Sequence, residues 1–250
     1  MLKFSEANAK TKKLNKVRSL ARYLKGRKVY SLDLSSGWSC PGACDCMAKV
    51  HMIDGKPKLI DGPKTRFRCF SASQEVQYPN TRLARLHNFK CFRKMQGSEQ
   101  CRDLILKSLP RDIGILRYHV AGDFFKLAYL IGAIAAAEAR PDVLFYGYTK
   151  SFRHLLRIRD WVDPSKGLLR PNFLLTASLG SKYDNLVPQL GLRSAIVVNY
   201  RREARKLGLS VDSNDSHAAT SGGNYALLIH GTQPAGSKAS KAVTAQRKNR

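Results

Sequence analysis

Acidic residues are scarce in this chain of 250 residues: 18 Asp and Glu stand against 44 Lys and Arg, a formal net charge of +26. Basic residues are dense before residue 29 and after residue 235, and the stretch between these ends also carries a positive excess. A field of this sign favours a polyanionic partner, with nucleic acid as the first expectation. The alternative is a soluble protein whose basic surface has no such partner.

Long apolar runs are also missing. The longest, Ala128 to Ala137, is rich in alanine and too short to span a membrane, so we predict a buried helix there and no membrane partner. The N-terminus has no secretory signal pattern. We therefore expect the six cysteines to be reduced thiols in an intracellular compartment rather than disulfides.

No repeat of fixed period is visible, and a hydrophobic content of 43% predicts a folded chain. Short apolar runs typical of strands alternate with amphipathic helical patterns, which indicates parallel strands joined by crossover helices. The strand-like runs are Val29–Leu34, Ile115–Ala121, Val143–Thr149, Phe173–Ala177, Ala195–Tyr200 and Tyr225–His230. Six such strands fit either a doubly wound open sheet or a partial (βα) barrel.

We predict the second arrangement, an α/β fold in which a six-stranded parallel partial (βα) barrel forms one domain over residues 29–235. A basic N-terminal arm, residues 1–28, precedes it and contains one helix near Ser5–Leu24 with a narrow apolar stripe. Residues 50–66 hold two turn signals and are expected to form a hairpin or an irregular loop. The C-terminal tail, residues 236–250, is small, polar and basic, which predicts disorder.

Three cysteines, Cys40, Cys44 and Cys46, lie in the loop that follows the first strand, and Cys69 comes a little later. Thiolates this close along the chain indicate a metal or iron–sulfur site. Four thiolates suit a structural zinc ion, although the one-residue gap between Cys44 and Cys46 is unlike a zinc knuckle. Three suit an iron–sulfur cluster with one open iron, and the position at a strand end favours this version. A disulfide or free thiols are the alternatives.

Polar residues gather where the predicted strands end, and in parallel α/β folds those ends build the site. His119 and Asp123 either face a ligand or serve as a core histidine and a helix cap. Thr149 and Lys150 either bind an anion or cap a helix. The remaining polar residues and glycines at these ends are Gly122, Ser178, Arg201 and His230.

The segment Asp212–His217 offers two carboxylates and an imidazole, a set that suits a divalent cation. Asp, Asn and Ser are also ordinary turn formers, and we favour the turn. A metal-dependent nuclease would need this segment to converge with His230 or Asp123.

Several motifs together carry a resemblance to a known family. They are Ser39-Cys-Pro-Gly-Ala-Cys-Asp-Cys46, Asp61-Gly-Pro-Lys-Thr-Arg-Phe-Arg-Cys-Phe-Ser-Ala-Ser73, His119-Val-Ala-Gly-Asp-Phe124, Phe145-Tyr-Gly-Tyr-Thr-Lys150 and Leu228-Ile-His-Gly-Thr-Gln233. From about residue 29 to 235 the chain resembles the gene-product-88 family of bacteriophage proteins, which implies the host cytoplasm as its location. That family is largely uncharacterised. Its recurring cysteines correspond to Cys40, Cys46 and Cys69 here, and Cys44 is an addition.

The layout is more distantly similar to radical S-adenosylmethionine enzymes, which place a three-cysteine loop after the first strand of a six-stranded partial barrel. This resemblance implies an iron–sulfur cluster on Cys40, Cys46 and Cys69, with S-adenosylmethionine at the open iron. The usual Cys-x3-Cys-x2-Cys spacing is absent, because Cys44 and Cys46 are one residue too close. Asp123 and Lys150 would act as catalytic residues. The cofactor would be bound by Gly122, Asp123, Thr149, Ser178 and Arg201.

Three functions follow from these patterns. The first is an iron–sulfur enzyme that acts on nucleic acid or a nucleotide. The second is a non-enzymatic nucleic-acid-binding protein of phage replication with structural zinc. Its phosphate contacts would come from the helix Thr81–Lys94, through Arg82, Arg85, Lys90 and Arg93. The third is the metal-dependent nuclease.

Overall fold

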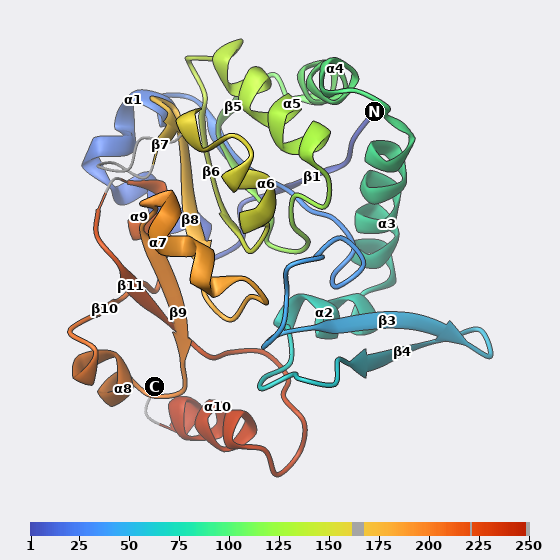
Figure 1. Ribbon diagram of the computed structural model, residues 1–250, viewed down its shortest axis with the longest axis vertical. Coiled ribbons are helices and arrows are strands. Elements are labelled where there is room, and N and C mark those ends of the chain that lie inside the picture. Colours follow the sequence, from blue (N-terminus) through green and yellow to red (C-terminus); the bar gives the residue numbers. More distant parts are fainter. Residues whose placement is uncertain (162–167, 221, 249–250) are drawn as a thin grey trace.

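A large, mostly parallel sheet organises the chain in the computed structural model, which describes residues 1–161, 168–220 and 222–248. The strand order is β1-β2-β5-β6-β8-β9-β11-β10, with β7 paired to the side of β8 (Figure 1). Among the described strands of this sheet, only β1 and β7 run antiparallel to their neighbours. The strands are β1 Phe4–Glu6, β2 Lys28–Leu32, β5 Ile113–Tyr118, β6 Leu144–Thr149, β7 Leu168–Arg170, β8 Phe173–Ser178, β9 Ser194–Val198, β10 Ser210–Val211 and β11 Tyr225–Leu228.

All six predicted strands are present, as β2, β5, β6, β8, β9 and β11, and each differs from its predicted bounds by a few residues at most. These six lie side by side in their order along the chain. A doubly wound sheet would reverse direction at a switch point, so that alternative is excluded. A mixed α/β fold with a mostly parallel sheet is confirmed. The described strands do not close into a barrel, and the curvature of a partial barrel stays a prediction.

The two faces of the sheet bury different clusters, because side chains alternate along each strand. Leu116 and Phe145 point to the face covered by helices α3 to α7, whereas Ile115 and Tyr146 point to the opposite face. That opposite face is covered by the N-terminal segment and α9. The helices are α1 Ala21–Leu24, α2 Phe70–Gln77, α3 Pro79–Lys94, α4 Ser98–Ser108, α5 Leu127–Glu138, α6 Phe152–Leu156, α7 Val187–Leu190, α8 Arg201–Lys206, α9 Ser216–Ala219 and α10 Lys238–Lys248. Single-turn 3-10 helices, η3 and η4, cover Arg159–Trp161 and Asp184–Leu186.

The N-terminal arm corrects one prediction. In place of a single helix over Ser5–Leu24 it forms β1, the 3-10 helices η1 (Thr11–Lys16) and η2 (Arg18–Leu20), and α1. The break falls at Val17, whose backbone is extended (φ −88°, ψ 107°). This bend lets Leu14 and Leu20 both reach the sheet, where they are buried. Tertiary packing has overridden the local helical pattern.

The C-terminal tail corrects a second prediction, because its residues 238–248 form helix α10 and are not disordered. Ala239 and Ala242 are buried on one side of this helix, in a cluster with Ile229 and Phe67. Two alanines three positions apart are a weak apolar signal in a sequence. They are enough to dock a helix where the rest of the protein offers a hydrophobic surface to pack against. Residues 249–250 lie outside the described part.

The predicted hairpin is present as β3 (Ala48–Ile53) and β4 (Lys56–Asp61), which project from the body (Figure 1). Its turn residues Asp54 and Gly55 both have positive φ, 52° and 71°, as a tight two-residue hairpin turn requires. Among the described helices, none is long and apolar enough to cross a membrane.

Candidate functional site

The cysteine loop after β2 crosses the carboxyl ends of the central strands. The backbone N–H groups of Cys44 and Asp45 donate to the carbonyl of Gly180, which follows β8, at 3.2 and 3.0 Å. On the way the loop passes the end of β6 so closely that a Cβ on Gly42 would lie 2.1 Å from the Lys150 carbonyl oxygen. The loops of β2, β6 and β8 therefore meet at one rim, as predicted for a parallel sheet.

The stretch that leads to Cys69 is fastened to the same rim from the other side. The N–H groups of Arg66 and Phe67 donate to the carbonyl of Asp45, at 2.8 and 3.1 Å. The amide of Gln233, beyond β11, accepts from the Arg68 N–H at 2.8 Å and donates to the Arg68 carbonyl at 3.0 Å. Cys69 then precedes the first residue of α2. Residues far apart in sequence thus bring Cys69 to the cysteine loop.

Three of the four predicted thiols are electrostatic neighbours. Burial raises the pKa of the Cys40 thiol well above its usual value, and the charges of Asp123, Cys69 and Cys46 raise it further. Burial likewise raises the pKa of Cys46 to about 11, with Lys150 acting against the rise and Cys69 adding to it. Cys40, Cys46 and Cys69 therefore share one neighbourhood with Asp123 and Lys150. All three residues are half-buried.

Within the described part of the chain, no three His, Cys, Asp or Glu side chains are already arranged to hold a metal ion. Cys44 holds the loop in place through its backbone, because its N–H group donates a hydrogen bond to the Gly180 carbonyl. The structure thus places Cys40, Cys46 and Cys69 together without forming a finished site.

Asp123 joins the ends of β5 and β6. Its carboxylate accepts from the Thr149 hydroxyl at 2.6 Å and from the N–H groups of Lys150 and Phe124, each at 2.7 Å. Burial raises the pKa of this carboxyl, although each of these hydrogen bonds lowers it. With three donors already bound, Asp123 serves to position the rim.

Lys150 is buried and its ammonium group is fully engaged. It donates to the carbonyl and hydroxyl of Ser178, both at 2.8 Å, and to the carbonyl of Leu179 at 2.6 Å. None of these acceptors is charged, and the influence of Lys150 on the nearby Cys46 thiol is to lower its pKa, against the effect of burial. The structure therefore brings Thr149, Lys150 and Ser178 together as predicted, with Lys150 as a buried cation beside the thiols.

Gly122 is needed for the approach of the two loops. Its φ is +93°, and a Cβ there would lie 2.6 Å from both the Leu34 Cβ and the Ser39 hydroxyl. Arg201 lies elsewhere: it is the first residue of α8 and is exposed to solvent. Of the residues predicted to bind a cofactor, Arg201 is the one that the structure leaves outside the cluster.

His119 is a core residue, which was one of its two predicted roles. Its ring hydrogen-bonds the Tyr129 hydroxyl at 2.9 Å and packs edge-on against Phe124. Burial, and secondarily the charge of Arg117, lowers the pKa of His119 to about 3, so the ring is neutral. It faces the helix-covered cluster of aromatic side chains and not the cysteines.

The segment Asp212–His217 is a turn that leads into α9, as favoured. Asp212 accepts hydrogen bonds from the N–H groups of Asn214 and His217. Asp215 is fully buried and pairs with Arg117 and, at 2.7 Å, with Lys10. Both carboxylates are thus occupied by groups of the protein. The pairing of Lys10 with Asp215, more than 200 positions away, had no signal in the sequence.

Together these observations define a mostly parallel α/β protein with a cysteine cluster and a buried lysine at the carboxyl rim of its sheet. Residues 2–248 match the family model described as Gene product 88. The chain therefore belongs to the gene product 88 family of bacteriophage proteins. No curated protein matches the chain. No solved structure matches it either.

Proposed function

We propose that this protein binds an iron–sulfur cluster through Cys40, Cys46 and Cys69. The observation that supports the proposal is that the cysteine loop and the segment leading to Cys69 are hydrogen-bonded to each other, and that Cys69 influences the pKa of both Cys40 and Cys46. Thiolates are the protein ligands of such clusters. A cluster with several thiolates is anionic, and a nearby buried cation favours its binding.

A structural zinc ion is the weaker alternative. Zinc sites of this kind use four closed ligands in a tetrahedron. A cluster held by only three thiols has one iron without a protein ligand. An open iron of this kind suits a site at the carboxyl rim of the sheet. When bound, such a group can hold S-adenosylmethionine at its open iron and supply an electron to it.

The protein's own groups have supporting roles in this proposal. Asp123 holds the ends of β5 and β6 together, and Gly122 lets the cysteine loop close over them. Lys150 offsets the negative charge of the thiolates. Because the Asp123 carboxylate already accepts three hydrogen bonds, the amine of S-adenosylmethionine would have to find a different partner.

The decisive experiment is oxygen-free purification followed by iron and sulfide analysis and a visible absorbance spectrum. We expect brown protein with about four irons per chain. Cys40→Ser, Cys46→Ser and Cys69→Ser should each lose most of the iron. Cys44→Ser and Cys91→Ser, the matched controls, should keep it. Iron that is absent from the wild type, or retained in all three site variants, would refute the proposal.

The choice of ligand at the open iron needs a second experiment. Reduced, cluster-loaded protein is mixed with S-adenosylmethionine, and the release of methionine and 5′-deoxyadenosine is followed. Release that requires the reductant and the three cysteines supports a radical enzyme. A loaded cluster without release limits the function to an iron–sulfur protein, and zinc in place of iron would favour the structural alternative.

A further inference from the structure

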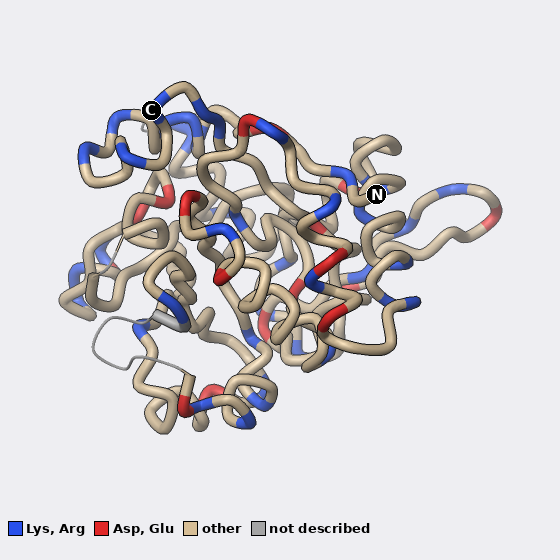
Figure 2. The backbone as a smooth tube through the Cα atoms, turned by 90° about the horizontal axis from the view of Figure 1, so that it is seen from above, with Lys and Arg blue, Asp and Glu red and all other residues tan. Residues whose placement is uncertain are grey.

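Helices α8 and α10 lie next to each other at one end of the molecule (Figure 1). They are joined by an ion pair between Lys238 and Glu203 at 3.5 Å, and by a hydrogen bond from the Gln246 amide to the Asn199 carbonyl at 2.9 Å. Lys and Arg positions are dense along the chain near the C-terminus (Figure 2). The exposed cations are Arg201, Arg202, Arg205, Lys206, Lys238, Lys241, Arg247 and Lys248.

This α8–α10 face, defined by those eight residues, has almost no charge of the opposite sign. Glu203 is the one acidic residue in the two helices as described, and it is half-buried and bound to Lys238. Among the described residues, none of the other seven cations of the face has an ion-pair partner. Their charge is therefore available to a partner in solution.

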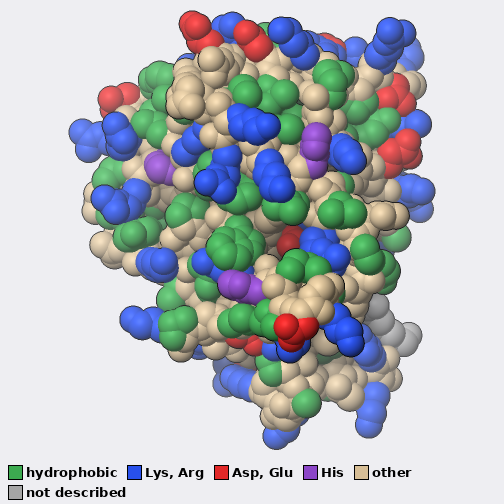
Figure 3. Space-filling view, turned by 90° about the vertical axis from the view of Figure 1, so that its right-hand side faces the viewer, with side chains coloured by type: hydrophobic (Ala, Val, Ile, Leu, Met, Phe, Trp, Pro, Cys, Tyr) green, Lys and Arg blue, Asp and Glu red, His purple; other side chains and the backbone are tan. Residues whose placement is uncertain are grey.

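The alternative basic face, on α3, has fewer basic side chains available to bind phosphate than its sequence indicates. Arg85 is buried and donates to the Ser71 carbonyl at 2.9 Å and to the Gln74 side chain at 3.0 Å. Arg82 donates to the Glu75 carbonyl at 2.7 Å. The prediction that both would reach phosphates is therefore wrong for Arg85 and unsupported for Arg82. Elsewhere on the α3 side, basic side chains are dispersed among polar and apolar ones (Figure 3).

We propose that the α8–α10 face binds the phosphate backbone of nucleic acid. Four of its eight cations are arginines, whose planar guanidinium groups match phosphate oxygens in pairs. The 11 residues of α10 span about 16 Å, a length over which a duplex offers roughly ten negative charges. An anionic membrane fits less well, because a helix that lies on a bilayer needs an exposed apolar side. The apolar side of α10, Ala239 and Ala242, is buried against the protein.

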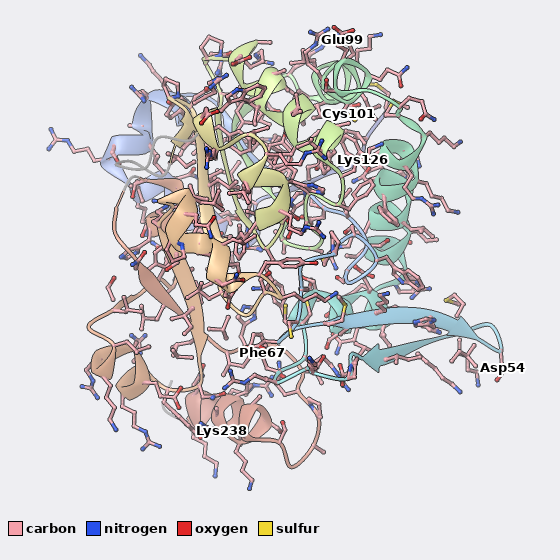
Figure 4. All side chains as sticks on the ribbon, viewed as in Figure 1. Asp54, Phe67, Glu99, Cys101, Lys126 and Lys238 are labelled. Carbon is pink, nitrogen blue, oxygen red and sulfur yellow. The ribbon has the colours of Figure 1, made fainter. Side chains whose placement is uncertain are left out.

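Helix α10 links this face to the segment that carries Cys69. Helix α10 packs against Phe67, which lies two residues before Cys69, and Lys238 lies just beyond it (Figure 4). The inference does not depend on the cluster, since it rests on charge and exposure alone.

The test is binding of a fluorescently labelled duplex and a single-stranded oligonucleotide of equal length, measured by anisotropy at several salt concentrations. The variant Arg201→Gln, Arg202→Gln, Arg205→Gln and Lys206→Gln removes four charges from the face. We expect its affinity to fall at least tenfold near 0.1 M salt, and the slope of log K against log salt to fall by about 3. Circular dichroism checks that the variant is folded.

A control variant removes the same charge from exposed sites on α3 and α4, at Lys90, Arg93, Lys94 and Lys107. It should change the affinity less than threefold. Equal losses in both variants, no binding by the wild type, or tighter binding to phosphatidylserine vesicles than to either oligonucleotide would each overturn the inference. The α8 variant should keep the iron content of the wild type, which separates this test from that of the cluster.

Discussion

The substitution Asp215→Asn tests how the N-terminal arm is held to the sheet. The Asp215 side chain has no solvent exposure and pairs with Arg117, whose side chain is only 10% exposed, and with Lys10 from the arm. The Tyr146 hydroxyl donates to it at 3.2 Å. Asparagine keeps the shape but removes the negative charge, so two cations lose their partner and the Arg117 charge stays buried.

The size of the effect follows from that burial. Removing one partner of a buried ion pair costs about 3–5 kcal/mol, because an uncompensated charge is left inside. Asp142→Asn is the matched control: Asp142 also contacts two arginines, Arg27 and Arg140, but its side chain is 40% exposed. An exposed pair contributes at most about 1 kcal/mol. The two variants should therefore differ by at least about 2 kcal/mol.

Urea unfolding between pH 3 and 8 is the assay. Burial raises the pKa of Asp215, but Arg117 and Lys10 outweigh it, and the net pKa lies below the usual value. A carboxyl with a lowered folded pKa stabilises the protein above its unfolded pKa and loses that contribution as the pH falls through the folded pKa. The gap between wild type and Asp215→Asn should thus narrow in acid. Equal losses for the two variants, or a gap that is constant with pH, would refute the reasoning.

Three other outcomes are expected from thermal and urea unfolding. Gly122→Ala should lower the free energy of unfolding by at least about 2 kcal/mol, because Gly122 has a positive φ and a Cβ there would lie 2.6 Å from the cysteine loop. Gly97→Ala is the control: Gly97 has open space around it, so the free energy of unfolding should fall by less than half of that amount. Lys150→Met should cost about 1–3 kcal/mol by leaving buried carbonyl groups unpaired, whereas Lys182→Met at an exposed site should be nearly neutral. Truncation after Ser237 removes α10 and should lower the melting temperature and increase dye binding to the uncovered apolar surface; an unchanged melting temperature would show that the helix is not docked.

The central strands were predictable because each is a short apolar run bounded by turn residues. In β5 every residue is buried, which matches the continuous hydrophobic pattern of a parallel strand covered on both faces. The hairpin was predictable from Asp54-Gly55, since few residues adopt the positive φ that its turn needs.

The two ends of the chain were not predictable in the same way. The arm reads as one amphipathic helix, but its fold is decided by contacts with the sheet, such as the burial of Leu14 and Leu20. In the tail, Ala239 and Ala242 dock against Ile229 and Phe67, which are distant in sequence. Local pattern cannot reveal a helix whose stability comes from a surface elsewhere in the chain.

At the rim, the sequence located the polar residues but not their partners. A polar side chain at a strand end can bind a ligand or can satisfy a neighbouring loop, and the two look alike along the chain. Asp123 and Lys150 each make three hydrogen bonds within the protein. Among the described residues, no side chain hydrogen-bonds the thiols of Cys40, Cys46 or Cys69, and only the backbone of Gly37 acts on Cys40, so the proposed cluster would displace no side-chain partner there. The chemistry of this protein should therefore be sought at its sulfur atoms.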